Sequence, residues 1–218
     1  MNDPNGLVYL DGEYHLFYQY NPTASEWGRI GWGHAVSRDL IHWTELPEAL
    51  PATEHGMAFT GSAVVDSHNT SGLSDGQAPA IVAIYTCHSL VDDAPHQTQH
   101  LAWSVDRGRS WQRYEGNPVL DIGSGSFRDP KVFWHTETSQ WVMAIVLASE
   151  CNVQFYRSPN LLEWSHLSDF GPCGNTEGEW ECPDLFPLTL EDGSGRHKWI
   201  LKVDNTLGAV AGDSGGQY

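Results

Sequence analysis

Three acidic residues, Asp3, Asp129 and Glu181, each lie one or two positions before a proline in short motifs of similar type. Two carboxyl groups on either side of a glycosidic bond are sufficient to hydrolyse it, one as nucleophile or base and the other as proton donor. A third carboxylate can hold the hydroxyl groups of the sugar. These residue types therefore predict glycoside hydrolysis, provided that the fold brings the three acids together.

The residues around two of these acids indicate different roles for them. Glu181 lies among a tryptophan, a cysteine and a proline, and this partly apolar surround is expected to favour the neutral, proton-donating form. Asp3 is flanked by Asn2 and Asn5, whose amides can donate hydrogen bonds, so Asp3 is expected to stay ionised. The proton donor is thus predicted to be Glu181, and the nucleophile Asp3.

The chain after each acid reads as a β-strand. The run Leu7–Leu10 follows Asp3, and the run Lys131–Trp134 follows Asp129. Proline lacks the hydrogen-bond donor that a central strand needs, and it restricts the residue before it. Each acid is therefore predicted at the entrance of a strand.

A seven-residue pattern of Ser, then Asp or Asn, then Trp recurs at Ser37–Trp43 and Ser158–Trp164, and Ser104–Trp111 repeats it with one residue inserted. Its tryptophans are 68 and then 53 residues apart, and each interval holds about four strand-like runs. Four-stranded units repeated at such intervals are typical of β-propeller blades, which pack around a central channel. The pattern predicts an all-β propeller of about three and a half blades. The predicted blades open at Leu7, Ser62, Lys131 and Leu185.

The position of the acids in these blades predicts that they meet. If each blade begins with its innermost strand, then Asp3, Asp129 and Glu181 take equivalent places around one end of the channel. Two apolar runs, Ala80–Tyr85 and Trp141–Leu147, are short and read as strands buried inside blades.

The composition limits the partners that the chain can have. Lys and Arg number 11 against 28 Asp and Glu, which gives a formal net charge of -17. This charge disfavours nucleic acids and anionic membranes as partners, because both are negatively charged. No run approaches the roughly 20 apolar residues of a membrane-spanning helix. Ten tryptophans and eight tyrosines favour an uncharged polar ligand, because such rings commonly line concave pockets.

The four cysteines show neither a Cys-x-x-Cys pair nor a Cys/His spacing typical of zinc ligands, so no metal site is predicted. Cys173 and Cys182 are close enough in sequence to form a disulfide, and buried free thiols are the alternative.

Six further motifs, spread over nearly the whole chain, add a specific resemblance. They are Asn2–Gly6, Phe17–Pro22, Trp32–Ala35, Phe59–Ser62, Arg128–Pro130 and Glu181–Asp184. In these motifs the chain resembles glycoside hydrolase family 32, the invertases, inulinases and levanases. The resemblance implies a five-bladed propeller with Asp3 as nucleophile, Glu181 as general acid/base and Asp129 as the residue that binds fructose hydroxyls. It also implies sugar contacts from Asn2, Gln19, Trp27, Phe59, Thr60 and Arg128.

The same resemblance implies a retaining enzyme that cleaves terminal β-fructofuranosyl units from sucrose or fructans through a fructosyl-enzyme intermediate, with no metal or cofactor. Residues 1–218 then form the N-terminal portion of a catalytic propeller, and the remaining blades and the C-terminal β-sandwich of the family are expected to be missing. The resemblance implies a secreted protein, although the first residues are polar and lack the apolar core of a signal peptide.

Three alternative functions stay open from the sequence: a propeller that binds carbohydrate without cleaving it, an inactive fragment, and a related five-bladed glycosidase directed at arabinose or xylose units. The sequence also leaves open the choice among sucrose, inulin and levan, the choice between hydrolysis and fructosyl transfer, and the oligomeric state.

Overall fold

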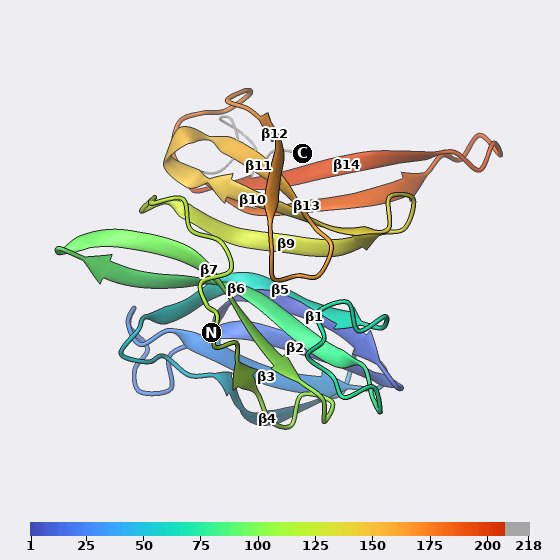
Figure 1. Ribbon diagram of the computed structural model, residues 1–218. Helices are drawn as coiled ribbons and strands as arrows, with labels where there is room; N and C mark the ends of the chain where they lie inside the picture. The colour runs from blue at the N-terminus through green and yellow to red at the C-terminus, as the bar shows by residue number, and fades with distance from the viewer. Residues whose placement is uncertain (208–218) are drawn as a thin grey trace.

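The computed structural model describes residues 1–207, which form four antiparallel sheets (Figure 1). Each sheet is one blade, and its strands follow one another in chain order. Blade 1 contains β1 (Asn2–Leu10), β2 (Glu13–Tyr20), β3 (Gly31–Ser37) and β4 (Trp43–Leu50). Blade 2 contains β5 (Met57–Asp66), β6 (Ala80–Val91), β7 (Ala94–Ser104) and β8 (Gln112–Arg113). Blade 3 contains β9 (Phe127–His135), β10 (Gln140–Leu147), β11 (Asn152–Ser158) and β12 (Ser165–Phe170), with the short 3-10 helix η1 (Ala148–Glu150). Blade 4 contains β13 (Trp180–Thr189) and β14 (His197–Asn205).

The first strand of each blade is the innermost one. β1 packs on β5, β5 on β9, and β9 on β13, so consecutive inner strands lie side by side around a central channel. This arrangement confirms the all-β propeller, with three four-stranded blades and two strands of a fourth within residues 1–207. No helix in this part of the chain is long and apolar enough to cross a membrane.

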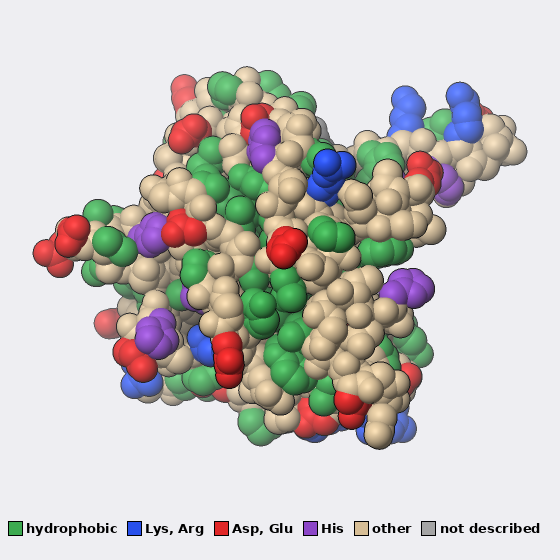
Figure 2. Space-filling model, in the orientation of Figure 1, with side chains coloured by type: hydrophobic (Ala, Val, Ile, Leu, Met, Phe, Trp, Pro, Cys, Tyr) green, Lys and Arg blue, Asp and Glu red, His purple; other side chains and the backbone are tan. Residues whose placement is uncertain are grey.

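The surface reflects the acidic composition. Figure 2 shows Asp and Glu side chains scattered over one face of the molecule, while fewer Lys and Arg side chains appear there. Apolar side chains are also visible on this face, including near its middle. The acidic groups are thus spread over this face and do not form one charged patch.

The strand entrances were predicted wrongly. The inner strands begin at Asn2, Met57, Phe127 and Trp180, five or four residues before the predicted openings, and the acids lie within them. The ladder to the neighbouring strand shifts register beside each acid, between Asn2 and Pro4, opposite Asp129, and between Glu181 and Asp184. A β-bulge leaves a residue outside the ladder, so proline's missing donor costs little there.

The recurring Ser–Trp pattern forms the turn between the third and fourth strand of each four-stranded blade. In each turn the tryptophan indole N–H donates to a backbone carbonyl three residues earlier, from Trp43 to Leu40 at 3.1 Å, from Trp111 to Gly108 at 3.1 Å and from Trp164 to Leu161 at 2.9 Å. The repeat therefore encodes one turn, used once per blade.

The core consists of apolar layers between adjacent blades. On β6, Ile81, Ala83 and Tyr85 pack against blade 1, whereas Val82 and Ile84 pack against blade 3. On β10, alternate residues likewise face blade 2 and blade 4. Because side chains of a strand alternate between the two faces of the sheet, a strand that is covered on both faces is apolar throughout. The two predicted buried strands are confirmed on this ground.

A pair of buried histidines lies where blade 2 meets blade 1. His15 Nδ1 is 3.1 Å from His34 Nε2, and a Cβ atom at Gly108 would come within 2.8 Å of the His34 ring. Gly108 belongs to the turn that carries the inserted residue, and the next residue, Arg109, forms a 2.8 Å ion pair with Glu13. The insertion thus brings the turn of blade 2 against the histidines of blade 1.

Stability is expected to fall in acid because of these histidines. Burial, then the neighbouring His15 and Arg109, lowers the pKa of His34 to about 3, and burial also lowers the pKa of His15. The unfolded chain therefore binds a proton at His34 below about pH 6.5 that the folded chain excludes, which costs about 1.4 kcal/mol per pH unit. We expect His34→Phe, which keeps a ring against Phe17, to lose about 2 kcal/mol less stability between pH 7 and 4.5 than the parent. Urea unfolding at both pH values measures this difference, and parallel losses in parent and variant would contradict it.

Candidate active site

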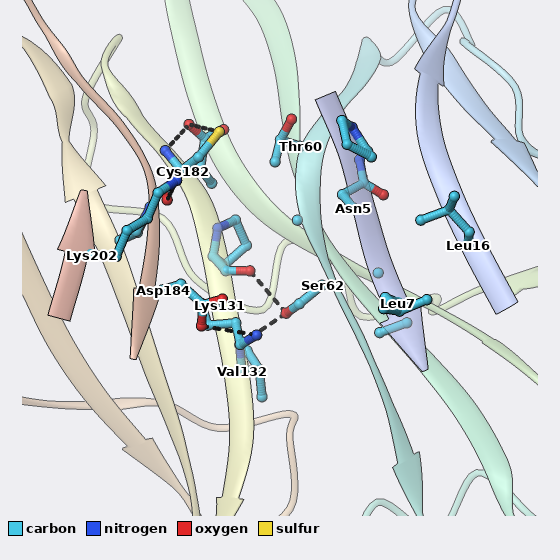
Figure 3. A pocket seen from close by; sticks show the side chains of 17 residues that line it. Asn5, Leu7, Leu16, Thr60, Ser62, Lys131, Val132, Cys182, Asp184 and Lys202 are labelled. Atoms are coloured by element: carbon cyan, nitrogen blue, oxygen red, sulfur yellow. Dashed lines mark hydrogen bonds and ion pairs between the residues drawn. The ribbon is translucent and has the colours of Figure 1, made fainter. Parts of the chain in front are cut away.

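A cavity of about 390 Å³ lies between the four inner strands (Figure 3). Thr60 and Cys182 lie toward one end of it, where Asp129 is hydrogen-bonded to Cys182. Lys131 and Asp184 form a 3.0 Å ion pair toward the other end. The end that carries Asp129 is the one at which the predicted acids come together.

Asp3 is held by donors from two blades. Gln19 Nε2 donates to Asp3 Oδ2 at 3.0 Å, and the hydroxyl of Thr60 donates to the same oxygen at 2.7 Å. Asn2 Nδ2 donates to Asp3 Oδ1 at 3.3 Å and to Gln19 Oε1 at 3.1 Å. Asn5 was predicted as a further donor, which is wrong, because its side chain is buried without a hydrogen-bond partner among the described residues. A carboxylate that accepts three hydrogen bonds is fixed in orientation.

Asp129 is the buried acid of the site, with 5% of its surface exposed. Burial raises the pKa of its carboxyl to about 6, and the charges of Glu181 and Asp3 act in the same direction. The backbone N–H of Cys182, at 3.0 Å from Oδ2, and the Arg128 guanidinium oppose this rise. Thr60, which lines the same cavity as Asp129, donates to Asp3, and Arg128 contacts both Glu181 and Asp129. The predicted convergence of the three carboxylates is therefore confirmed.

Arg128 connects three acids of the site. Its Nη2 donates to Glu181 Oε1 at 2.9 Å and to Glu179 Oε2 at 2.7 Å, and its Nε lies 3.8 Å from Asp129 Oδ2. Glu181 keeps 39% of its side chain exposed. The predicted apolar surround of Glu181 is therefore wrong. Adjacent side chains of a strand point to opposite faces, so Trp180 packs into the core between blades 3 and 4 while Glu181 faces Arg128.

Trp27 and Phe59 lie at the rim of the site. Trp27 is 73% exposed, and its ring meets that of Phe59 edge to face at a centroid distance of 6.4 Å. Phe59 stacks on His88 at 4.6 Å with an angle of 4° between the rings. These contacts place both predicted aromatic residues beside Thr60, the donor to Asp3.

Sequence reasoning missed Glu179, Thr86 and His88. Glu179 lies directly before β13 and two residues before Glu181, and this period-two spacing in extended chain is a signal that both acids face the same side. The hydroxyl of Thr86 accepts the backbone N–H of Asp129 at 3.0 Å, a contact between blades that no local pattern predicts.

Neither a disulfide nor a metal-binding group is present among the described residues. All four cysteines are free thiols, so the disulfide between Cys173 and Cys182 does not form, and burial raises the pKa of the Cys182 thiol. No group of three or more His, Cys, Asp or Glu within residues 1–207 is arranged to hold a metal ion.

A propeller whose inner strands bring carboxylates to one end of the channel is the architecture of a glycosidase, and the family comparison agrees. The model of the glycosyl hydrolases family 32 N-terminal domain matches residues 1–218. The chain belongs to glycoside hydrolase family 32, as its motifs predicted.

Curated relatives that match over the whole chain include a levanase, an exo-inulinase and an invertase. The levanase of Bacillus subtilis is 50% identical over 220 residues, all of this chain and 32% of that protein. The extracellular exo-inulinase of Aspergillus niger is 44% identical, over all of this chain and 45% of that protein. The invertase of Schizosaccharomyces pombe is 43% identical, over all of this chain and 38% of that protein. The chain thus spans about a third to just under half of these relatives.

Solved structures give the same result. The exo-inulinase of Aspergillus awamori superimposes with a TM-score of 0.87 and 42% identity, over 93% of this chain and 43% of that one. The β-fructofuranosidase of Schwanniomyces occidentalis, solved with fructosyl-erythritol, gives a TM-score of 0.86 and 41% identity, over 93% of this chain and 40% of that one. The propeller fold is therefore shared with enzymes of this family.

The buried charge of Asp129 is expected to destabilise the folded chain at neutral pH. Its pKa of about 6 lies above the ordinary value of 3.8, so the unfolded state loses this proton first, and the folded state is penalised as the pH rises from 4 to 7. We expect Asp129→Asn to raise the free energy of unfolding by about 2 kcal/mol at pH 7 and by much less at pH 4. Urea unfolding at the two pH values measures this. A gain of equal size at both would show that it does not come from ionisation.

Proposed function

We propose that residues 1–218 supply the reacting groups of a retaining β-fructosidase, with Asp3 as nucleophile, Glu181 as general acid/base and Asp129 as the residue that binds fructose hydroxyls. The observation that carries this proposal is the convergence of the three carboxylates, from blades 1, 3 and 4, at one end of the channel, where Thr60 binds Asp3 and Arg128 contacts both Glu181 and Asp129. Glycosidases with two carboxyl groups in such an arrangement need no further chemical group.

In the first step, Asp3 attacks the anomeric carbon of a terminal β-fructofuranosyl unit, and the bond to the leaving oxygen breaks. Glu181 gives its proton to that oxygen, so the leaving sugar departs neutral. The donors Gln19 and Thr60 keep the Asp3 carboxylate oriented for attack. In the second step, Glu181 takes a proton from water, whose oxygen displaces Asp3 and releases fructose.

Asp129 and Arg128 contact the sugar but form no covalent bond to it. The Asp129 carboxylate is fixed by the Cys182 N–H and is buried, so a hydrogen bond from a sugar hydroxyl to it forms in a low-dielectric surround. Arg128 holds Glu181 near this carboxylate. Asn2, Gln19, Trp27, Phe59 and Thr60 are the further sugar contacts of the proposal.

The substrates in this proposal are terminal β-fructosyl units of sucrose or a fructan. The fructofuranosidase of Schwanniomyces occidentalis was solved in complex with fructosyl-erythritol, with fructose and with fructosylnystose. The fructan 1-exohydrolase of Cichorium intybus was solved in complex with 1-kestose. Relatives from Aspergillus niger, Aspergillus ficuum and Aspergillus awamori are named extracellular exo-inulinases, which supports a site of action outside the cell. Membership of family 32 favours fructosides over the arabinose and xylose units of the alternative reading.

We further propose that residues 1–218 are the N-terminal portion of a larger catalytic propeller. Within residues 1–207, β14 has a single partner, β13, whereas the first two strands of blades 1 to 3 continue into four-stranded sheets. The share of the relatives' length that the chain spans supports the same division. Residues 208–218 of this predicted domain lie outside the described part.

The proposal predicts that the chain releases fructose from sucrose and inulin, and that Asp3→Asn lowers the rate at least about 10³-fold. The reason is that an amide cannot form the fructosyl ester, while its size leaves the Gln19 and Thr60 contacts near their positions. Reducing-sugar release measures the rate, and Asp11→Asn, which changes an acid in the β1–β2 turn, is the matched control. Fructose release that persists in Asp3→Asn would rule out Asp3 as nucleophile.

A second variant separates cleavage from binding. Glu181→Gln is expected to keep fructose affinity within about threefold, while it slows sucrose cleavage about 10²- to 10⁴-fold, because the poor leaving group then lacks a proton donor. Isothermal titration with fructose and the sucrose assay measure the two quantities. If the parent bound fructose but cleaved neither sucrose nor inulin, the carbohydrate-binding alternative would be favoured.

A further inference from the structure

His88 lies on the same face of blade 2 as Thr86, which contacts the backbone of Asp129. On β6, Thr86 and His88 are two positions apart, so their side chains point to the same face of the sheet. Across the ladder, Thr86 pairs with Gln99 and His88 pairs with Gln97. Thr86 contacts the backbone of Asp129, and His88 is the next side chain on this face toward the end of the hairpin.

A bulge in β5 sends two adjacent side chains in different directions. Ala58 pairs with Cys87 and Gly61 pairs with Tyr85, so Phe59 and Thr60 together lie opposite one residue of β6. Thr60 reaches the Asp3 carboxylate, whereas Phe59 stacks on the His88 ring. The Phe59–His88 stack therefore lies outside the group of carboxylates.

Trp27 completes an aromatic wall at this rim. Its ring meets His88 at 6.3 Å and Phe59 at 6.4 Å, nearly perpendicular to both. Trp27 is largely exposed, so the wall borders solvent. A sugar ring that extends beyond the fructosyl unit held by the acids would run along this wall, because pyranose and furanose faces pack well on aromatic rings.

The His88 ring also offers a polar atom. Gln97 Nε2 lies 3.3 Å from Nδ1, and an amide nitrogen can only donate, so with the Gln97 amide oriented in this way Nδ1 accepts and the hydrogen of the neutral ring is on Nε2. Burial and then the positive Arg128 lower the pKa of His88, which keeps the ring neutral at pH 7. No contact from the described residues to Nε2 competes with a ligand hydroxyl.

We propose that His88 determines specificity for the sugar unit next to the cleaved fructosyl unit: its ring supports Phe59 in the aromatic wall, and its Nε2–H donates to a hydroxyl of that second unit. The inference rests on the proposed function, since it needs a substrate of at least two sugar units. In this proposal the three carboxylates bind the fructosyl unit, and His88 binds the sugar unit attached to it.

The test compares a one-unit and a three-unit ligand, fructose and 1-kestose, by isothermal titration at pH 7. It uses the 218-residue chain carrying Glu181→Gln as the background for each variant, because the parent is expected to cleave 1-kestose during the titration. We expect His88→Ala to weaken 1-kestose binding about tenfold, because it removes both a hydrogen bond and a ring contact, and to leave fructose binding within about twofold. His88→Phe, which keeps the stack and loses the donor, is expected to weaken 1-kestose about threefold to fivefold. His96→Ala is the control, since His96 lies on the same hairpin and pairs with Asp121 away from the wall.

A spectroscopic readout tests the donor directly. In a ¹H–¹⁵N spectrum of the histidine rings, 1-kestose is expected to shift the His88 Nε2–H signal, and fructose is expected to leave it in place. Equal weakening of both ligands in His88→Ala, or no weakening of either, would overturn the inference while the proposed function stands. If the parent chain bound neither fructose nor 1-kestose, the proposed function would fail and the inference with it.

Discussion

The site depends on one backbone feature, the β-bulge in each inner strand. A regular strand would send alternate side chains into the layers between blades, and neighbouring residues could not both serve the channel. The bulges at Asp3, Asp129 and Cys182 place these residues at φ values of 37°, 64° and 46°, in the left-handed region that non-glycine residues rarely adopt. Each costs on the order of 1–3 kcal/mol, and it persists because the flanking ladder fixes the chain on both sides.

The packed layers between the blades make this strain and the clustered charge tolerable. Blade 2 is apolar on both faces of β6, and blade 3 is apolar on both faces of β10, so the inner strands are held at fixed spacing by filled cores. Only Arg128 supplies a positive charge in direct contact with the acids among the described residues, and it is shared by Asp129, Glu179 and Glu181. Carboxylates held around a single guanidinium leave excess negative charge, which a folded chain retains only where a rigid scaffold prevents their separation.

The architecture and the convergence of the acids could be predicted from the sequence because both follow from repetition. The Ser–Trp turns mark the blades, and equivalent positions in blades meet at the channel. The bulges could not be predicted, because the rule that keeps proline out of a regular ladder indicates an irregularity without saying whether it is a strand entrance or a bulge. The surround of Glu181 was wrong for a related reason: neighbours in sequence are not neighbours in space when they point to opposite faces. Thr86 contacts Asp129, and His88 contacts Trp27, across boundaries between blades. No local pattern predicts such contacts.

The bulge in β5 separates the hydrogen bonds that orient the Asp3 carboxylate from the packing of the aromatic wall. Thr60 belongs to the network that orients the Asp3 carboxylate, and the adjacent Phe59 belongs to the aromatic wall with Trp27 and His88. A substitution in the wall alters contacts that lie one residue away along the chain from Thr60, the donor to Asp3, but on the other side of the bulge. The ladder on either side of the bulge remains in register, so the position of Thr60 does not depend on which side chain packs on Phe59. Under the proposed function, residues of the aromatic wall would therefore select the sugar unit that leaves without holding the fructosyl unit that reacts.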